Sequence, residues 1–166
     1  MSTTGKHLLL LRHAKSSWDD PALADHERPL SPRGRRAAKA IRSYLRKHEI
    51  PISLVLCSSA RRTQETIELV DPGGEIEIED GLYGASADEL LDRLRQVPEA
   101  AIVVMLVGHN PSIGELAIGL ARRRDELAAR KYPTGGLAWF SFLGPWRSLA
   151  PGQAELTEFV TPRELG

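Results

Sequence analysis

The stretch Leu-Leu-Leu-Leu-Arg-His, residues 8–13, decides the fold of this chain. Four consecutive leucines predict a central strand, because a strand that is covered on both faces is apolar throughout. The apolar run stops abruptly at Arg12 and His13. Ligands of α/β sheets bind at the carboxyl ends of the strands, so we expect these two side chains to belong to a functional site.

Length and composition narrow the class of protein. A chain of 166 residues suits one well-buried core, so we expect a single domain over residues 1–166. Basic and acidic residues number 22 each, so the chain has no overall positive charge that would attract nucleic acid. The basic clusters at 33–36 and 122–124 are interpreted as solvated helix faces. One cysteine, no apolar leader and no run of about 18 apolar residues predict a cytoplasmic protein without a membrane segment.

Strand and helix signals alternate along the chain, which predicts an α/β fold. A loop is expected at 14–30, followed by a helix of about four turns with Ser31 as N-cap and Pro32 at its first position. Further strands are expected at 52–57, 75–79 and 101–107. Further helices are expected after 58–59 and after a capping box at 86–89. Another helix is expected after 107, with Asn110 as its N-cap and Pro111 at its first position.

Two late strands are predicted at 137–143 and 155–160. The link between them holds no obvious helix, and a parallel connection would need a crossover of a dozen or more residues. We therefore expect these two strands to pair in antiparallel fashion at one edge of the sheet.

Three predicted strands end in polar side chains: Arg12-His13, Ser58-Ser59 followed by Arg61-Arg62, and His109-Asn110. Parallel strands with right-handed crossovers share one direction, so these groups can converge. Arginines from separate strands can hold the oxygens of a tetrahedral dianion, and such an anion would offset the unfavourable placing of cations in the first turn of a helix. One histidine with an unprotonated nitrogen could attack phosphorus while the other donates a hydrogen bond.

At these residues the chain resembles the histidine phosphatase superfamily. The resemblance lies in Leu-Arg-His-Ala at 11–14, Ser-Ser-Ala-Arg-Arg-Thr-Gln-Glu-Thr at 58–66 and Val-Gly-His-Asn-Pro at 107–111. The segments 28–34 and 82–86 are most similar to the SixA-type phosphohistidine phosphatases. The resemblance implies a three-layer α/β/α sandwich with a mostly parallel central sheet, as in phosphoglycerate mutase-like proteins, and a phosphatase that needs neither metal nor cofactor.

The resemblance also implies a role for each site residue. His13 would be the nucleophile that becomes phosphorylated, and Arg12 would bind the phosphoryl oxygens. The family arginine of the middle signature lies four residues before a threonine, which selects Arg62 and makes Arg61 a surface neighbour. His109 would contact the transferring group. The implied reaction is hydrolysis of phosphohistidine on a protein.

The chain departs from the family pattern where a general acid is expected. The mutase and monoesterase branches have a glutamate at a position that corresponds here to Tyr83. An alkoxide leaving group needs a proton, whereas the imidazole of phosphohistidine can leave neutral once its free nitrogen is protonated. A missing acid therefore favours a phosphoramidate substrate, unless Asp19, Asp20 or Asp25 of the long loop supplies the proton.

Two alternatives stay open at this point: a small-molecule phosphomonoesterase or mutase of the same superfamily, and a catalytically silent module that binds phosphorylated partners. A cysteine phosphatase would need an arginine at the sixth position after Cys57, where Thr63 stands, so Cys57 is interpreted as a core residue. His7 and His48 are expected at a strand start and on a helix surface, and His26 is interpreted as an unlikely accessory of the site. The substrate, a phosphorylated protein or a small phosphorylated molecule, and the oligomeric state are not determined by the sequence.

Overall fold

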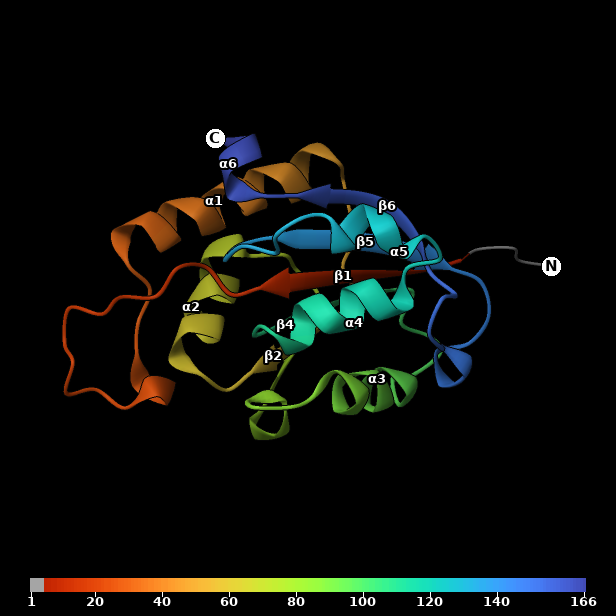
Figure 1. The fold of residues 1–166 in the computed structure, drawn as a ribbon, viewed down its shortest axis with the longest axis horizontal. Helices are drawn as coiled ribbons and strands as arrows, with labels where there is room; N and C mark the ends of the chain where they lie inside the picture. The colour runs from red at the N-terminus through yellow and green to blue at the C-terminus, as the bar shows by residue number, and fades with distance from the viewer. Residues whose placement is uncertain (1–4) are drawn as a thin grey trace.

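The computed structural model describes residues 5–166, which are built around a six-stranded sheet (Figure 1). The strand order is β3-β2-β4-β1-β5-β6, so the leucine strand lies inside the sheet as its sequence predicts. The strands are β1 (Lys6–Arg12), β2 (Leu54–Ser58), β3 (Glu75–Glu79), β4 (Val103–Gly108), β5 (Leu137–Phe142) and β6 (Glu155–Val160).

The sheet is mostly parallel. β1 pairs with β4, β4 with β2, and β2 with β3, all in parallel, while β5 is antiparallel to both β1 and β6. The expected antiparallel pairing of the two late strands is confirmed. The register sets Arg12 opposite Gly108, and Leu11 opposite Leu137. The carboxyl ends of β1, β2 and β4 therefore meet at one edge, beside the start of β5.

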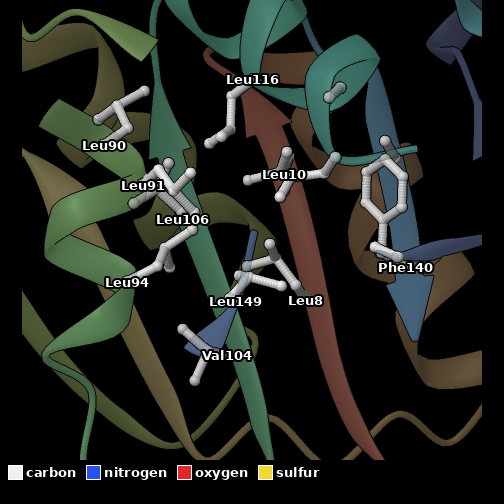
Figure 2. Packing of buried hydrophobic residues seen from close by; sticks show 14 of the residues in the cluster. Leu8, Leu10, Leu90, Leu91, Leu94, Val104, Leu106, Leu116, Phe140 and Leu149 are labelled. Carbon is white, nitrogen blue, oxygen red and sulfur yellow. The ribbon is translucent and has the colours of Figure 1, made fainter. Parts of the chain in front are cut away.

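Helices cover both faces of the sheet, which confirms the three-layer sandwich (Figure 1). Alternate leucines of β1 serve the two cores: Leu8 and Leu10 pack on one side, and Leu9 and Leu11 on the other. Figure 2 shows the first of these cores. The face of the sheet on that side is covered by α3 (Ala87–Arg95), α4 (Ser112–Leu120) and α5 (Arg124–Ala128). The opposite face of the sheet is covered by α1 (Pro32–Lys47), α2 (Arg61–Val70) and α6 (Pro162–Leu165). Among the helices of residues 5–166, none is both long and apolar enough to cross a membrane.

The start of α1 is fixed by contacts with the loop that follows β1. Ser31 Oγ accepts a hydrogen bond from the Gly34 amide at 3.0 Å, as expected of an N-cap. A side chain at Gly34 would place its Cβ 2.1 Å from the carbonyl oxygen of Lys15. Glycine at this position lets the chain two residues beyond His13 pack directly on the helix.

Three expectations about local structure need correction. α4 begins at Ser112 and not at Pro111, because the Asn110 Oδ1 accepts from the Gly114 amide at 3.1 Å while its Nδ2 donates to the carbonyl of Tyr132. The link between β5 and β6 contains a short 3₁₀ helix, Trp146–Ser148, because the buried Trp146 indole donates to the carbonyl of Ala101 at 2.7 Å. The arginines at 122–124 are exposed, but only the last of them lies in a helix.

Candidate active site

Four side chains singled out from the sequence meet at the carboxyl edge of the sheet. His13 directly follows β1, Arg62 lies in the first turn of α2 after β2, and His109 directly follows β4. The rings of His13 and His109 are 5.2 Å apart between centroids, and the Arg62 Nη2 is 3.3 Å from the His109 Nδ1. Arg12 lies at the end of β1, where burial and, second, the positive charge of Arg62 lower its pKa.

His13 is held as a neutral imidazole with a defined tautomer. The residue is 7% exposed, and its Nδ1 lies 2.7 Å from the carbonyl oxygen of Ala14. A carbonyl can only accept, so the Nδ1 carries the proton and the Nε2 keeps a free lone pair. Burial, followed by the charges of neighbours that include Arg62, lowers the pKa of His13 to about 3. The Nε2 is therefore unprotonated at neutral pH.

Hydrogen bonds to three separate segments fix the turn that carries His13. The His13 amide donates to the Gly108 carbonyl at 3.0 Å, and the Gly135 amide donates to the His13 carbonyl at 2.9 Å. The amide of the next residue, Ala14, donates to the Thr66 Oγ1 at 3.0 Å, and that hydroxyl donates to the Arg62 carbonyl. Thr66 thus ties the turn after β1 to the first turn of α2.

Arg62 points into the site, and Arg61 points away from it. The side chain of Arg62 is buried, with its Nη1 2.8 Å from the backbone carbonyl of Asp25 and its Nη2 3.0 Å from the Asp25 Oδ2. Arg61 is exposed and pairs with Glu65 at 3.0 Å, one helical turn along α2. The difference agrees with the selection of Arg62 by its spacing from Thr66.

Asp25 is the loop carboxylate that reaches the site, and it is ionised. Its Oδ2 accepts from the Tyr83 hydroxyl at 2.6 Å as well as from Arg62, and its Oδ1 accepts from Arg28 at 3.2 Å. These bonds, that of Tyr83 first, lower the pKa of Asp25 to about 2. The other two loop aspartates, Asp19 and Asp20, are exposed. In this arrangement Asp25 anchors Arg62 and has no proton to donate.

Arg12 has donors to spare. Its Nη1 donates to the carbonyl oxygen of Tyr132 at 2.9 Å, while its Nε is buried without a hydrogen-bond partner within residues 5–166. A buried donor that lacks a partner costs about 1–3 kcal/mol. An anion bound between Arg12 and Arg62 would supply the missing acceptor and relieve the repulsion between the two guanidinium groups.

His109 is also neutral, in the opposite tautomer to His13. A guanidinium can only donate, so the His109 Nδ1 accepts from Arg62, and the Nε2 carries the proton toward the Ser58 Oγ at 2.8 Å. Burial and the charge of Arg62 lower the pKa of His109 to about 4. The Nδ1 of this ring can accept a proton when an anion enters beside Arg62.

The structure corrects the interpretation of His26. Its Nε2 lies 2.9 Å from the Ser59 Oγ, its Nδ1 lies 2.8 Å from the Glu27 carboxylate, and its ring meets the edge of Tyr83 at 4.8 Å. His26 therefore lines the rim of the site. The sequence held no signal for this, because the loop at 14–30 has no periodicity from which its path could be predicted.

The remaining nucleophile, Cys57, is part of the core. It is fully buried in β2, and burial raises the pKa of its thiol to about 12. A thiol that stays protonated is a poor nucleophile. Within residues 5–166, no three histidine, cysteine or carboxylate side chains are grouped closely enough to hold a metal ion.

Comparison with known proteins defines the class to which this fold and site belong. The sequence model of the histidine phosphatase superfamily (branch 1) matches residues 8–101, a segment that includes His13 and Arg62. The chain belongs to the histidine phosphatase superfamily, and it is a phosphatase of that superfamily.

Within the superfamily the chain is of the SixA type. It is 35% identical to a protein of Nakamurella multipartitia with the provisional name phosphohistidine phosphatase SixA, with a TM-score of 0.87 over 95% of this chain and 96% of that one. A protein of Agrobacterium tumefaciens with the same provisional name is 29% identical, with a TM-score of 0.82 over 95% and 98% of the two chains. An uncharacterized protein of Mycobacterium tuberculosis is 35% identical over 159 residues, which are 92% of this chain and 100% of that relative.

The lowered pKa values of the buried His13 and the half-buried His109 predict a loss of stability in acid. An unfolded imidazole takes up a proton near pH 6.5, whereas the folded pKa of His13 is about 3 and that of His109 about 4. Between these values the unfolded state binds more protons, so the free energy of unfolding falls as the pH is lowered. For His13 alone we expect a loss of roughly 2 kcal/mol from pH 7 to pH 5, measured by urea unfolding.

The variant His13→Gln is the control for this measurement. It lacks one of the two titrating rings, so its stability should fall less between the same pH values. Asp25 does not interfere, because its stabilising charge is lost only as the pH falls below its ordinary pKa of 3.8 toward about 2. Equal losses in the wild type and the variant would contradict the neutral state of His13.

Proposed function

We propose that this phosphatase hydrolyses phosphohistidine on a protein, through a phosphorylated His13. The choice of substrate rests on the protonation state of Asp25. This carboxylate is bound to Arg62 and Tyr83 and has a pKa of about 2, so it has no proton for a leaving alkoxide. An imidazole leaving group needs no such donor, because a proton on its free nitrogen lets it depart neutral.

The first step transfers the phosphoryl group to His13. The lone pair on the His13 Nε2 forms a bond to phosphorus as the bond from phosphorus to the substrate nitrogen breaks. The electron pair of that bond stays on the substrate imidazole, which already carries a proton on its other nitrogen and leaves neutral. The Ala14 carbonyl, 2.7 Å from the His13 Nδ1, keeps the proton on that nitrogen throughout.

The second step is attack by water. The oxygen of water bonds to phosphorus, the bond from phosphorus to the His13 Nε2 breaks, and a proton passes from the water to solvent or phosphate. Because the Nδ1 has kept its proton, the ring regains its electron pair as a neutral imidazole. The hydrogen bond to Ala14 therefore supports both the attack and the departure.

Arg12, Arg62 and His109 would hold the three equatorial oxygens in both steps. The Nε of Arg12 has no hydrogen-bond partner within residues 5–166, and the Nη2 of Arg62 becomes available once its bond to the His109 Nδ1 is given up. A bound dianion would favour protonation of the His109 Nδ1, which would then donate to an oxygen. Removal of one such donor from a site of this kind costs about 10²–10³ in kcat.

A comparison of substrates tests the proposed function. The wild type should turn over a histidine-phosphorylated protein with a kcat/KM at least about tenfold above that for sugar phosphates and phosphoglycerate, because the latter need a protonated leaving oxygen. Release of inorganic phosphate from each substrate, at equal concentrations, measures this. A preference for the sugar phosphates would assign the protein to the monoesterase alternative instead.

The two neighbouring arginines of α2 offer a matched pair of variants. Arg62→Ala should lower kcat/KM by about 10²–10³, because the phosphoryl oxygens lose a buried donor. Arg61→Ala should change it by less than about twofold, because that side chain is exposed and pairs with Glu65 on the surface of α2. Phosphate release by the two variants decides, and equal losses would show that the wrong arginine has been assigned.

A further inference from the structure

A basic pocket lies at the same edge of the sheet as the active site, displaced toward β5 and β6. Its volume is about 400 Å³. It adjoins the site through the chain itself: Lys15 lines the pocket two residues after His13, and Thr134 lines it one residue before Gly135, whose amide donates to the His13 carbonyl. Five cationic side chains line it, namely Lys15, Arg33, Arg130, Lys131 and Arg163.

The charge of this pocket is not balanced by the protein. Within residues 5–166, Arg130 pairs with Glu164 at 3.1 Å, and the other four cations have no carboxylate within 4.0 Å. Arg33 lies in the first turn of α1, where the helix dipole disfavours a positive charge. Because four of the five cations lack a carboxylate partner in the described part of the chain and the placement of Arg33 costs stability, the gathering of cations points to an anionic ligand.

The form of the pocket favours an acidic protein segment over a single phosphate. A compact phosphate is usually held by converging, buried donors, such as Arg62 in the active site. The five cations here are exposed and come from separate segments: the loop after β1, the start of α1, the link from α5 to β5, and α6. Exposed charges that are spread in this way complement an extended acidic surface.

Nucleic acid fits the pocket less well. Among residues 5–166, its other lining residues are Ala37, Pro133, Thr134, Thr161 and Pro162, none of which carries an aromatic ring on which a base could stack. The net charge of the whole chain is zero, which gives no long-range attraction to a polyanion.

We propose that this pocket docks an acidic segment of the protein that carries the phosphohistidine. The inference rests on the proposed function, and it specifies the substrate: the phosphorylated histidine is accompanied by Asp or Glu residues on the same protein. Charges at the rim of an interface act mainly on the rate of association and on its dependence on salt. The pocket therefore selects among phosphorylated proteins and leaves the chemical step to His13 and its neighbours.

The test uses two synthetic peptides, each with one phosphohistidine. One is flanked by Asp and Glu residues, and the other by Asn and Gln at the same positions. The pocket variant is Arg33→Glu with Arg163→Glu; both side chains are exposed, and a glutamate suits the first turn of α1, so the variant should fold. The control is Arg123→Glu with Arg147→Glu, which changes the net charge equally at two exposed arginines outside the pocket.

The wild type and the control should show a kcat/KM at least about tenfold higher for the acidic peptide than for the neutral one. The preference should shrink at high salt and disappear in the pocket variant, whereas turnover of free phosphohistidine should be the same in all three proteins. A preference that survives in the pocket variant, or that falls equally in the control, overturns the proposal.

A binding measurement separates this proposal from the proposed function. If the wild type hydrolysed neither peptide, the proposed function would be wrong, and fluorescence anisotropy with the unphosphorylated acidic peptide would still test the pocket. Tighter binding to the wild type and the control than to the pocket variant supports acidic docking. Equal binding of the peptide to the wild type, the control and the pocket variant overturns the proposal. The proposal is also overturned if a short single-stranded DNA binds the pocket more tightly than the acidic peptide does.

Discussion

The ion pair between Arg62 and Asp25 is the contact on which the arrangement of the site depends. A buried guanidinium without a partner is costly, and Arg62 lies beside two neutral imidazoles and a second arginine. Asp25 compensates its charge with both a carboxylate oxygen and a backbone carbonyl. The same carboxylate accepts hydrogen bonds from Tyr83 and Arg28. One charge therefore connects the loop at 14–30, the start of α2 and the turn at Tyr83 beside the active site.

This contact also shapes the chemistry that the site can support. A carboxylate that is bound to a guanidinium and a phenol stays ionised. The hydroxyl of Tyr83 donates a hydrogen bond to that carboxylate, and this hydrogen bond raises the pKa of Tyr83. Neither group is poised to protonate a leaving oxygen. An entering phosphoryl dianion would instead find the spare donor of Arg12 and could take the Arg62 Nη2 over from His109. Both lie close to His13, whose free lone pair on Nε2 is set by the hydrogen bond of its Nδ1 to a backbone carbonyl. Such a site is suited to a leaving group that brings its own proton.

The fold and the main site residues could be predicted because their signals are local. Leu8 to Leu11 alternate between two cores, and Ser31 caps its helix, for reasons that the sequence contains. The meeting of Arg12, His13, Arg62 and His109 follows from the shared direction of parallel strands. Asp19, Asp20 and Asp25 were equivalent in the sequence, because only the path of an aperiodic loop determines which of them reaches Arg62. The partners of Arg12 and His13 are backbone carbonyls, which leave no mark on residue type.

The most direct test of this account is to look for phosphate on His13. The enzyme is mixed with a phosphohistidine substrate labelled on phosphorus, denatured within the first turnovers at alkaline pH, and mapped by mass spectrometry. The account predicts an acid-labile phosphate on His13, formed at the rate of turnover or faster and absent from His13→Ala. Full turnover with no labelled enzyme, or with the label on another residue, would contradict it.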